Sequence, residues 1–182
     1  MARDLSPDAG VIELKVESLA SLFDPLDPFP LPTRDLSRTA EEFIVEWARE
    51  LPATAPIRLV LHVPALAGHD VPDLQAAFTT HFAQRMRSVG GDISELFRVG
   101  RTSLAIGLTM LVACVFGAQS AVMLFGSTPP ARILSEGLII LGWVANWRPV
   151  EIFLYDWWPL ARRRRLYQRL SDARIELIVA SD

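Results

Sequence analysis

The chain is poor in the residues that build most metal and redox centres. Among its 182 residues there are one cysteine and three histidines. A single cysteine cannot form an intramolecular disulfide, so nothing indicates an oxidising compartment. Zinc sites normally need three or four ligands at short spacings, and His62, His69 and His81 do not provide such spacings. We therefore expect no metal site, and we interpret His62 as a core or surface imidazole.

Sequence motifs of nucleotide and acyl-transfer enzymes are also lacking. No phosphate-binding loop, dinucleotide fingerprint or nucleophile elbow occurs, so we expect no cofactor and no enzymatic activity. Basic residues do not predominate, since 18 of them face 21 acidic ones, for a net charge of −3. Nucleic-acid binding is therefore not expected. Only Lys15 among the basic residues is a lysine, and this preference for arginine indicates a bacterial genome rich in G and C.

Apolar residues are abundant, and they are concentrated in two runs. Residues 102–125 carry no charge, and 24 helical residues extend about 36 Å, enough to cross a hydrocarbon core of about 30 Å. A buried helix of a soluble core is the alternative, but such helices rarely run so long without a charge. After a turn at 126–130 with two prolines, a second run at 133–155 would extend about 34 Å. We predict a transmembrane helical hairpin with these two spans.

Charges beside the runs predict the orientation of the hairpin. Arg98 and Arg101 precede the first run and four arginines follow the second, whereas the turn is followed only by Arg132. The positive-inside rule then places both termini in the cytoplasm, with the protein in the bacterial inner membrane. The N-terminal residues have acids and no continuous apolar core, so we expect no secretory signal there. An aromatic belt at the inner face is expected from Trp147, Tyr155, Trp157 and Trp158.

Residues outside the runs show the patterns of a small α/β domain. Apolar and polar residues alternate at 10–17, 57–63 and 174–179, which predicts three strands. Helices are expected at about 39–51, from about residue 73, and at about 160–170. We thus predict an α+β membrane protein: a cytoplasmic α/β domain at 1–100, a transmembrane hairpin at 101–158, and a basic helix and strand at 159–182 that rejoin the first domain.

Local patterns give these helices expected ends and faces. Thr39 and Glu42 match a capping box, and an apolar face follows from Phe43, Ile44, Trp47 and Leu51. Glu41, Glu42, Glu46 and Glu50 fit a solvated face. In the next helix Leu74, Phe78 and Phe82 recur every four residues, and a break is expected at Gly90–Gly91.

The segment at 24–32 holds four prolines, which favours an extended chain over a helix. One interpretation is a docking motif for a partner. The other, which we favour, is an ordered crossover in which Phe23, Leu26, Phe29 and Leu31 pack on their own domain.

In the two apolar runs, the candidate functional positions are the polar and the small residues. Charged residues inside spans are costly and often mark ion paths. Glu136 is expected about 4–5 Å inside the outer edge, and Arg148 lies three residues before Glu151 on a shared face. Structural anchoring is favoured over transport for all three. Small residues for close helix packing, within the hairpin or with a neighbouring subunit, are Ala113, Gly117, Ala121, Gly142 and Ala145. Cys114, in apolar surroundings, is expected to be inert.

Arginines after the second run form the densest cluster of charge. Near a cytoplasmic leaflet each basic residue contributes about 1 kcal/mol of attraction to anionic lipid. Nucleic acid is the competing ligand, but residues 1–84 hold 13 acidic and 6 basic residues. A lipid-facing anchor is therefore expected from Arg162, Arg163, Arg164, Arg165 and Arg169.

The run at 136–170, EGLIILGWVANWRPVEIFLYDWWPLARRRRLYQRL, resembles that of uncharacterised bacterial two-span membrane proteins with a small cytoplasmic α/β domain. This resemblance implies a topology but no activity and no site residues. Our hypothesis is a non-enzymatic membrane protein that acts as an interaction, scaffold or regulatory subunit and binds anionic lipid and a protein partner or further copies of itself. The alternative is a small oligomeric channel that uses Glu136 and Arg148; a membrane-bound enzyme ranks third.

Overall fold

The computed structural model describes residues 10–63, 71–126 and 128–179. The chain forms two compact units, and both ends of the chain contribute to the first. We call residues 1–89 with 162–182 the head unit, and residues 90–161 the hairpin unit. His69 lies outside the described residues.

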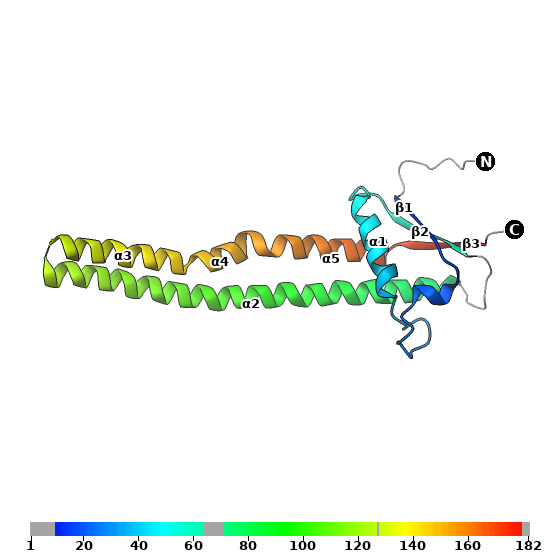
Figure 1. Cartoon of the computed structure of the whole chain (residues 1–182), viewed down its shortest axis with the longest axis horizontal. Helices are drawn as coiled ribbons and strands as arrows, with labels where there is room; N and C mark the ends of the chain where they lie inside the picture. Colours follow the sequence, from blue (N-terminus) through cyan, green and yellow to red (C-terminus); the bar gives the residue numbers. More distant parts are fainter. Residues whose placement is uncertain (1–9, 64–70, 127, 180–182) are drawn as a thin grey trace. The chain divides into compact units, whose positions relative to one another are not determined.

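The head unit contains a parallel sheet of three strands (Figure 1). The strands are β1 (Gly10–Lys15), β2 (Ile57–Val63) and β3 (Arg174–Val179), in the order β1-β2-β3. Gly10 is opposite Ile57 and Arg58 is opposite Arg174, so each neighbouring pair is parallel. The three predicted strands are thus confirmed, and the last strand of the chain pairs with the middle one.

Alternation along the strands gives the sheet one buried face. Ile12, Leu59 and Leu61 are fully buried, whereas the charged residues between them, such as Glu13 and Lys15, are exposed. Helices cover the buried face. Its aromatic core joins three segments, because Phe78 packs on Phe23 and Phe82 stacks on Tyr167.

Helix α1 (Arg38–Glu50) begins one residue earlier than predicted and has a different cap. The hydroxyl of Ser37 accepts a hydrogen bond from the backbone N–H of Ala40 at 3.3 Å. Glu42 instead pairs with Arg38 at 2.8 Å, so the predicted Thr39–Glu42 capping box is wrong. A Ser at this position accepts from the third residue of the helix just as Thr39 would have done.

The buried face of α1 is also displaced from the predicted one. Ile44 is buried as expected, together with Ala40, Val45 and Ala48. Phe43 and Trp47 lie on the exposed side and pack on each other, with ring centroids 5.7 Å apart. Small residues thus let α1 approach the sheet closely, and the large aromatic residues remain outside.

Helix α2 (Val71–Phe125) runs without interruption through residues 90 and 91, so the predicted break at Gly90–Gly91 is wrong. Two glycines weaken a helix by about 1 kcal/mol each, and neighbouring turns can supply more than that. Leu74, Phe78 and Phe82, which recur every four residues, are buried in the head unit. Helix α5 (Trp157–Ser171) starts three residues before the predicted helix and returns the chain to β3.

The proline-rich segment follows a short 3-10 helix, η1 (Leu19–Leu22), and is ordered by aspartates. Asp27 accepts hydrogen bonds from the backbone N–H groups of Asp35 at 2.7 Å and Phe29 at 3.0 Å. These two bonds hold the pKa of Asp27 below its usual value. Phe23 is buried, but Leu26 is 89% and Phe29 62% exposed. The crossover is therefore ordered as we expected, although these two side chains do not pack on the domain.

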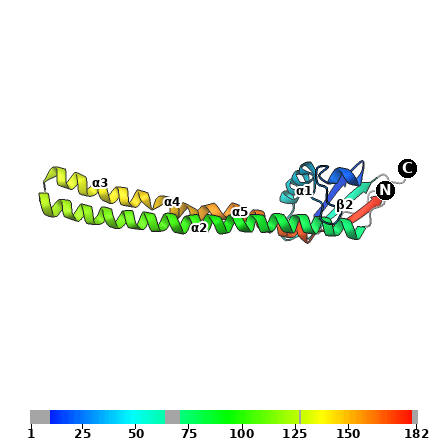
Figure 2. The same cartoon turned by 90° about the horizontal axis from the view of Figure 1, so that it is seen from below.

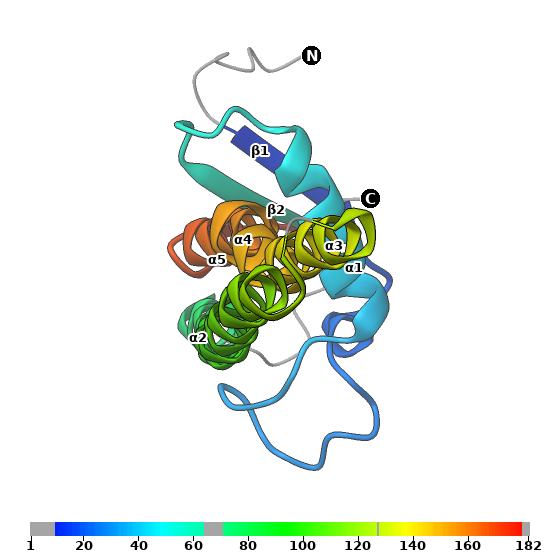
Figure 3. The same cartoon turned by 90° about the vertical axis from the view of Figure 1, so that its left-hand side faces the viewer.

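In the hairpin unit, the second half of α2 runs antiparallel to α3 (Pro129–Ala145), as Figures 2 and 3 show from two directions. Between them Gly126 adopts a φ of +64°, which glycine tolerates without strain. The predicted second span is not one regular helix. The chain turns at Asn146, continues as α4 (Trp147–Glu151), and widens into a π-helix, η2 (Ile152–Asp156).

Two helical stretches, Asp73–Phe125 and Pro129–Ser171, are long and apolar enough to cross a membrane. Only 17% of the most apolar window of each stretch is buried within the protein. Phe116, Leu124, Ile140 and Val144 are among the many large apolar side chains that remain exposed. A soluble core helix would bury such residues.

Candidate functional site

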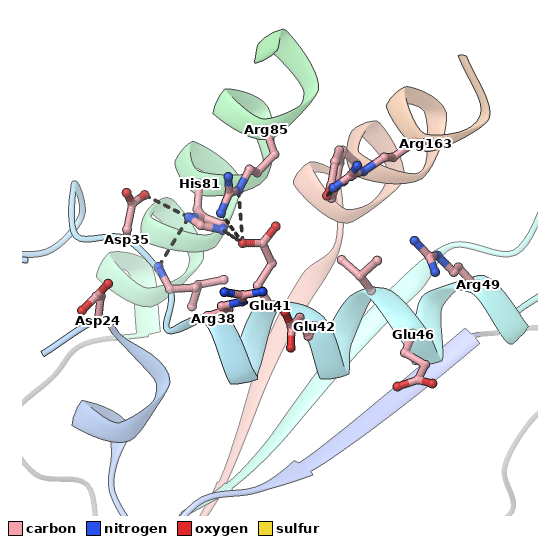
Figure 4. A pocket seen from close by; sticks show the side chains of 13 residues that line it. Asp24, Asp35, Arg38, Glu41, Glu42, Glu46, Arg49, His81, Arg85 and Arg163 are labelled. Carbon is pink, nitrogen blue, oxygen red and sulfur yellow. Dashed lines mark hydrogen bonds and ion pairs between the residues drawn. The ribbon is translucent and has the colours of Figure 1, made fainter. Parts of the chain in front are cut away.

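A polar groove of about 730 Å³ opens on the head unit between α1, the first part of α2, the last part of α5 and the end of the proline-rich segment (Figure 4). Its wall carries charges of both signs with few apolar atoms. The lining residues are Asp24, Asp35, Leu36, Arg38, Glu41, Glu42, Val45, Glu46, Arg49, His81, Arg85, Arg163 and Tyr167.

His81 is deeply buried at the base of the groove, with 4% of its surface exposed. Its Nδ1 atom lies 2.9 Å from Oδ1 of Asp35 and 3.4 Å from the backbone nitrogen of Leu36. The contact with Asp35 is shorter and joins a ring nitrogen to a carboxylate, so we take it as the main bond of Nδ1. On its other side, Nε2 faces Oε2 of Glu41 at 3.4 Å without forming a well-aligned hydrogen bond.

Glu41 is buried, with 8% of its surface exposed, and is not the solvated residue that we predicted. Burial raises the pKa of its carboxyl group, but the close approach of His81 and the hydrogen bonds and positive charge of Arg85 outweigh burial, so the pKa lies below its usual value. Nε and Nη2 of Arg85 both donate to Oε2, the first at 3.1 Å. Figure 4 shows His81 and Arg85 reaching from α2 to Glu41 on α1.

Sequence spacing did not reveal this chain of contacts from Asp35 through His81 and Glu41 to Arg85. Its contacts join residues that are 40 to 46 positions apart in sequence. One signal was available, since Glu41 follows the small Ala40 and lies three residues before the apolar Ile44, on the side that packs. An acid at such a position of an amphipathic helix indicates a buried partner.

The predicted lipid-facing arginines differ in their partners. Arg162, Arg163, Arg164 and Arg165 are all exposed, and Arg169 is partly buried. The side chain of Arg163 also bonds within its own helix, where Nε and Nη2 donate to the hydroxyl of Tyr167 at 3.1 and 3.0 Å. Its guanidinium also lies 5.4 Å from the centre of the Tyr167 ring.

Arg169 has a structural role in the head unit and is not a free basic residue. Its Nη2 atom donates to the backbone carbonyl of Pro52 at 2.8 Å and to that of Ala55 at 3.0 Å. These bonds join α5 to the loop between α1 and β2. Arg163 and Arg169 thus have intramolecular partners, and the lipid contact expected of the five arginines stays a prediction.

Within the hairpin unit, Arg148 is paired on two sides. Its Nη1 atom lies 3.3 Å from Oε2 of Glu151 and 3.0 Å from Oδ2 of Asp156. The indole N–H of Trp147 donates to the other oxygen of Glu151 at 2.9 Å. The extra residue of the π-helix lies between Glu151 and Asp156, and both acids face the same arginine. Glu136 is exposed and has no ion pair or hydrogen bond among the described residues.

Small residues bring α2 and α3 into close contact. A Cβ atom on Gly142 would lie 2.8 Å from Cδ1 of Leu111, and one on Gly107 would lie 2.9 Å from the carbonyl oxygen of Ala145. Cys114, Ala118 and Ala121 are buried on the same side of α2. Gly117 lies beside Leu138, whereas Ala113 is exposed and does not belong to this contact. We call this contact between α2 and α3 the seam.

Asn146 closes the seam where α3 ends. Its side-chain nitrogen donates to the carbonyl of Gly107 at 3.0 Å and to that of Gly142 at 2.9 Å. The bond to Gly142 satisfies a carbonyl group that the end of α3 leaves open, and the bond to Gly107 joins α3 to α2.

The aromatic residues predicted as a belt differ in their surroundings. Trp147, Tyr155 and Trp158 are exposed. Trp157 packs on Phe97 and donates its indole N–H to the carbonyl of Phe153 at 3.0 Å.

Among the residues that the structure describes, no group of three or more histidine, cysteine or acidic side chains could hold a metal ion. Comparisons with protein-family models, with curated proteins and with solved structures gave no match. The resemblance of residues 136–170 to bacterial two-span proteins therefore stays an expectation.

Proposed function

We propose that the chain is a non-enzymatic integral membrane protein in which the hairpin unit anchors the head unit at the cytoplasmic face of the bacterial inner membrane. There the head unit would serve as an interaction, scaffold or regulatory subunit, with both termini in the cytoplasm. The observation that carries the anchoring is the distribution of side chains in the hairpin. Small residues face the seam, and large apolar residues face outward, as in helices surrounded by lipid.

The groove of the head unit supports a binding role. Its charged side chains are held in place by one another, because Glu41, His81 and Arg85 contact each other below its surface. A preorganised surface loses little conformational entropy on binding. Charges of both signs on its wall fit a protein segment that also carries both signs, and such complementarity favours specificity.

The pairing of Arg148 disfavours the channel alternative. A residue that lines an ion path needs an exchangeable partner, whereas Arg148 is neutralised by Glu151 and Asp156 within its own helix. The arginines at 162–165 are exposed and are the candidates for contact with anionic lipid, whereas Arg169 donates to two backbone carbonyls of the head unit.

Photo-crosslinking in cells tests the binding role. A photoreactive amino acid is placed at Arg49 in the groove, and as a control at Lys15 on the open face of the sheet. We expect a discrete protein adduct from position 49 that is absent from position 15 and is lost when Glu46→Arg reverses a neighbouring charge. The same adducts from both positions, or none from either, would contradict a groove-specific partner.

A further inference from the structure

The close contacts of the seam fix which levels of α2 and α3 lie side by side. Gly117 contacts Leu138, and Gly142 contacts Leu111 and Cys114. The helices are antiparallel, so a step of two residues towards the N-terminus of α3 from Leu138 matches a step of two residues towards the C-terminus of α2 from Gly117. Glu136 therefore lies level with Gln119 of α2.

This register places Glu136 deeper than its position in the sequence indicates. Gln119 lies six residues before Phe125, so both polar side chains are about 9 Å along the helix from the outer end of the uncharged run. The span predicted at 133–155 had placed Glu136 only about 4–5 Å inside. At the greater depth, the short side chain of a glutamate does not reach the headgroups easily, and polar side chains in hydrocarbon are costly without a partner.

Neither side chain has a partner in the part of the chain that the structure describes. Gln119 and Glu136 are both exposed, and no hydrogen bond or ion pair of either occurs among the described residues. Ala118 and Ala121 mark the side of α2 that faces the seam. Successive residues are about 100° apart around a helix axis, so Gln119 lies roughly 130° from that side. Glu136 is likewise about 140° from the contacting side of α3. The two polar groups thus lie on opposite outer faces of one hairpin at one depth.

We propose that these two faces bind each other between copies of the chain, with Gln119 of one copy paired with Glu136 of the next. This inference rests on the proposed insertion of the hairpin in a membrane. Copies inserted in the same direction bring the two side chains to one level automatically. An amide can donate to a carboxyl oxygen, and glutamine is among the residues that join helices in membranes.

A contact between two different faces is heterologous, so it repeats from copy to copy and closes as a ring when the rotation allows it. Lipid tails interact equally well with any apolar face, so this polar pair selects the neighbour and its depth. The second copy is the partner because the chain itself supplies both halves of the bond at matching depth.

Disulfide trapping in membranes tests the contact. In a Cys114→Ala background, chains with Gln119→Cys and chains with Glu136→Cys carry different tags and are expressed together. We expect a mixed dimer on mild oxidation, at least fivefold above the yield of the control pair Gln119→Cys with Ile140→Cys. Ile140 is exposed on the same side of α3 but lies about 6 Å away along the helix. A yield equal to the control, or a dominant dimer between two Glu136→Cys chains, would overturn the proposal.

Substitutions at the pair give a second measurement on the purified protein in detergent. Glu136→Leu and Gln119→Leu should each weaken self-association about three- to tenfold, and the double variant should be no weaker than either single one. Glu136→Gln should retain association, since an amide can still pair with Gln119. Additive effects of the two leucine variants would contradict a direct pair.

Extraction of the same membranes with alkaline carbonate separates this inference from the proposed function. A chain that washes out is not inserted, so the proposed function fails and this inference fails with it. A chain that stays in the membrane but gives no mixed dimer leaves the anchoring intact and refutes only the contact.

Discussion

Glu41 shows how one buried carboxylate can couple the head unit to pH. Its pKa lies below its ordinary value of 4.5 because His81 and Arg85 outweigh the effect of burial. A carboxyl with a lowered folded-state pKa stabilises the fold above its unfolded pKa and loses that contribution as pH falls through the folded value. We therefore expect the protection of α1 amides from hydrogen exchange to decline as pH falls below about 4.5.

Glu41→Gln should remove much of that decline and destabilise the head unit by about 1–2 kcal/mol at neutral pH. The estimate is moderate because Arg85 is half exposed and water replaces part of the lost pairing. Hydrogen exchange of peptides from α1 in the full chain, normalised to intrinsic rates at each pH, measures both effects. Glu42→Gln is the control, since Glu42 is exposed. An unchanged pH profile in Glu41→Gln would exclude Glu41 as the source.

Arg169 and Arg165 provide a matched pair of arginines on α5. Arg169→Ala removes two hydrogen bonds to the carbonyls of Pro52 and Ala55, so exchange in the loop at 51–56 should become about five- to thirtyfold faster, equivalent to about 1–2 kcal/mol. Arg165→Ala loses the same charge from an exposed position and should leave the loop unchanged. Equal acceleration in both variants would indicate an effect of net charge.

At the scale of elements, Ser37 and Thr39 are the two candidate N-cap residues of α1. Ser37→Ala should destabilise the helix by about 1 kcal/mol because it removes the acceptor for the N–H of Ala40. Thr39→Ala should have almost no effect, since Thr39 lies inside the first turn and is exposed. Exchange of the first amides of α1 measures the difference. A larger effect of Thr39→Ala would restore the predicted capping box.

The sequence predicted the elements better than their ends and faces. Alternation identified all three strands, because one face of the sheet is buried and the other is exposed. It could not locate the cap of α1, since Ser37 and Thr39 each precede a plausible first turn. The face of α1 was misjudged because large aromatic residues were weighted above alanines, whereas the sheet accepts Ala40 and Ala48. Helix α2 continues through Gly90–Gly91 because of its length and packing. Helix propensities of single residues take neither into account.

Two glycines on α3 test how the seam holds the hairpin together. Gly142→Leu places new atoms against Leu111, whose Cδ1 atom would be 2.8 Å from the Cβ, and overpacking of this kind costs about 1–3 kcal/mol. Gly137 has nothing within 4 Å of its Cβ position, so Gly137→Leu is the control. Cys114 is buried in the seam and reports its opening. We expect about tenfold faster alkylation of this thiol in detergent for Gly142→Leu alone.

The same rate in both leucine variants would show that Cys114 is not shielded by α3. Such a result would also weaken the register from which we placed Glu136 level with Gln119, because that register depends on the contact of Gly142 with Leu111 and Cys114.

At the scale of the whole molecule, segments distant in sequence form the polar groove, and this explains why the groove was not predicted. Asp35, Glu41 and His81 come from a loop, α1 and α2, and no short motif connects them. The two apolar runs, by contrast, were evident because each is continuous in sequence. Contiguous features can be predicted from one sequence, whereas a site assembled by tertiary folding requires the fold first.

Topology is the property on which the proposed function depends most. Arginines lie at 98, 101 and 162–165, and only Arg132 lies close to the turn, so the turn should be outside and both ends inside. In a Cys114→Ala background, Thr128→Cys should react with an impermeant maleimide in intact cells, and Asp172→Cys only after permeabilisation. Thr128 is the N-cap of α3 and Asp172 follows α5, and both are exposed. Moving charge by Thr128→Arg with Arg162→Gln and Arg165→Gln should reduce labelling at a cysteine placed at the exposed Pro130, because the charge difference that orients the hairpin becomes smaller. Labelling of Asp172→Cys in intact cells would place the head unit outside and end the proposal of a cytoplasmic partner.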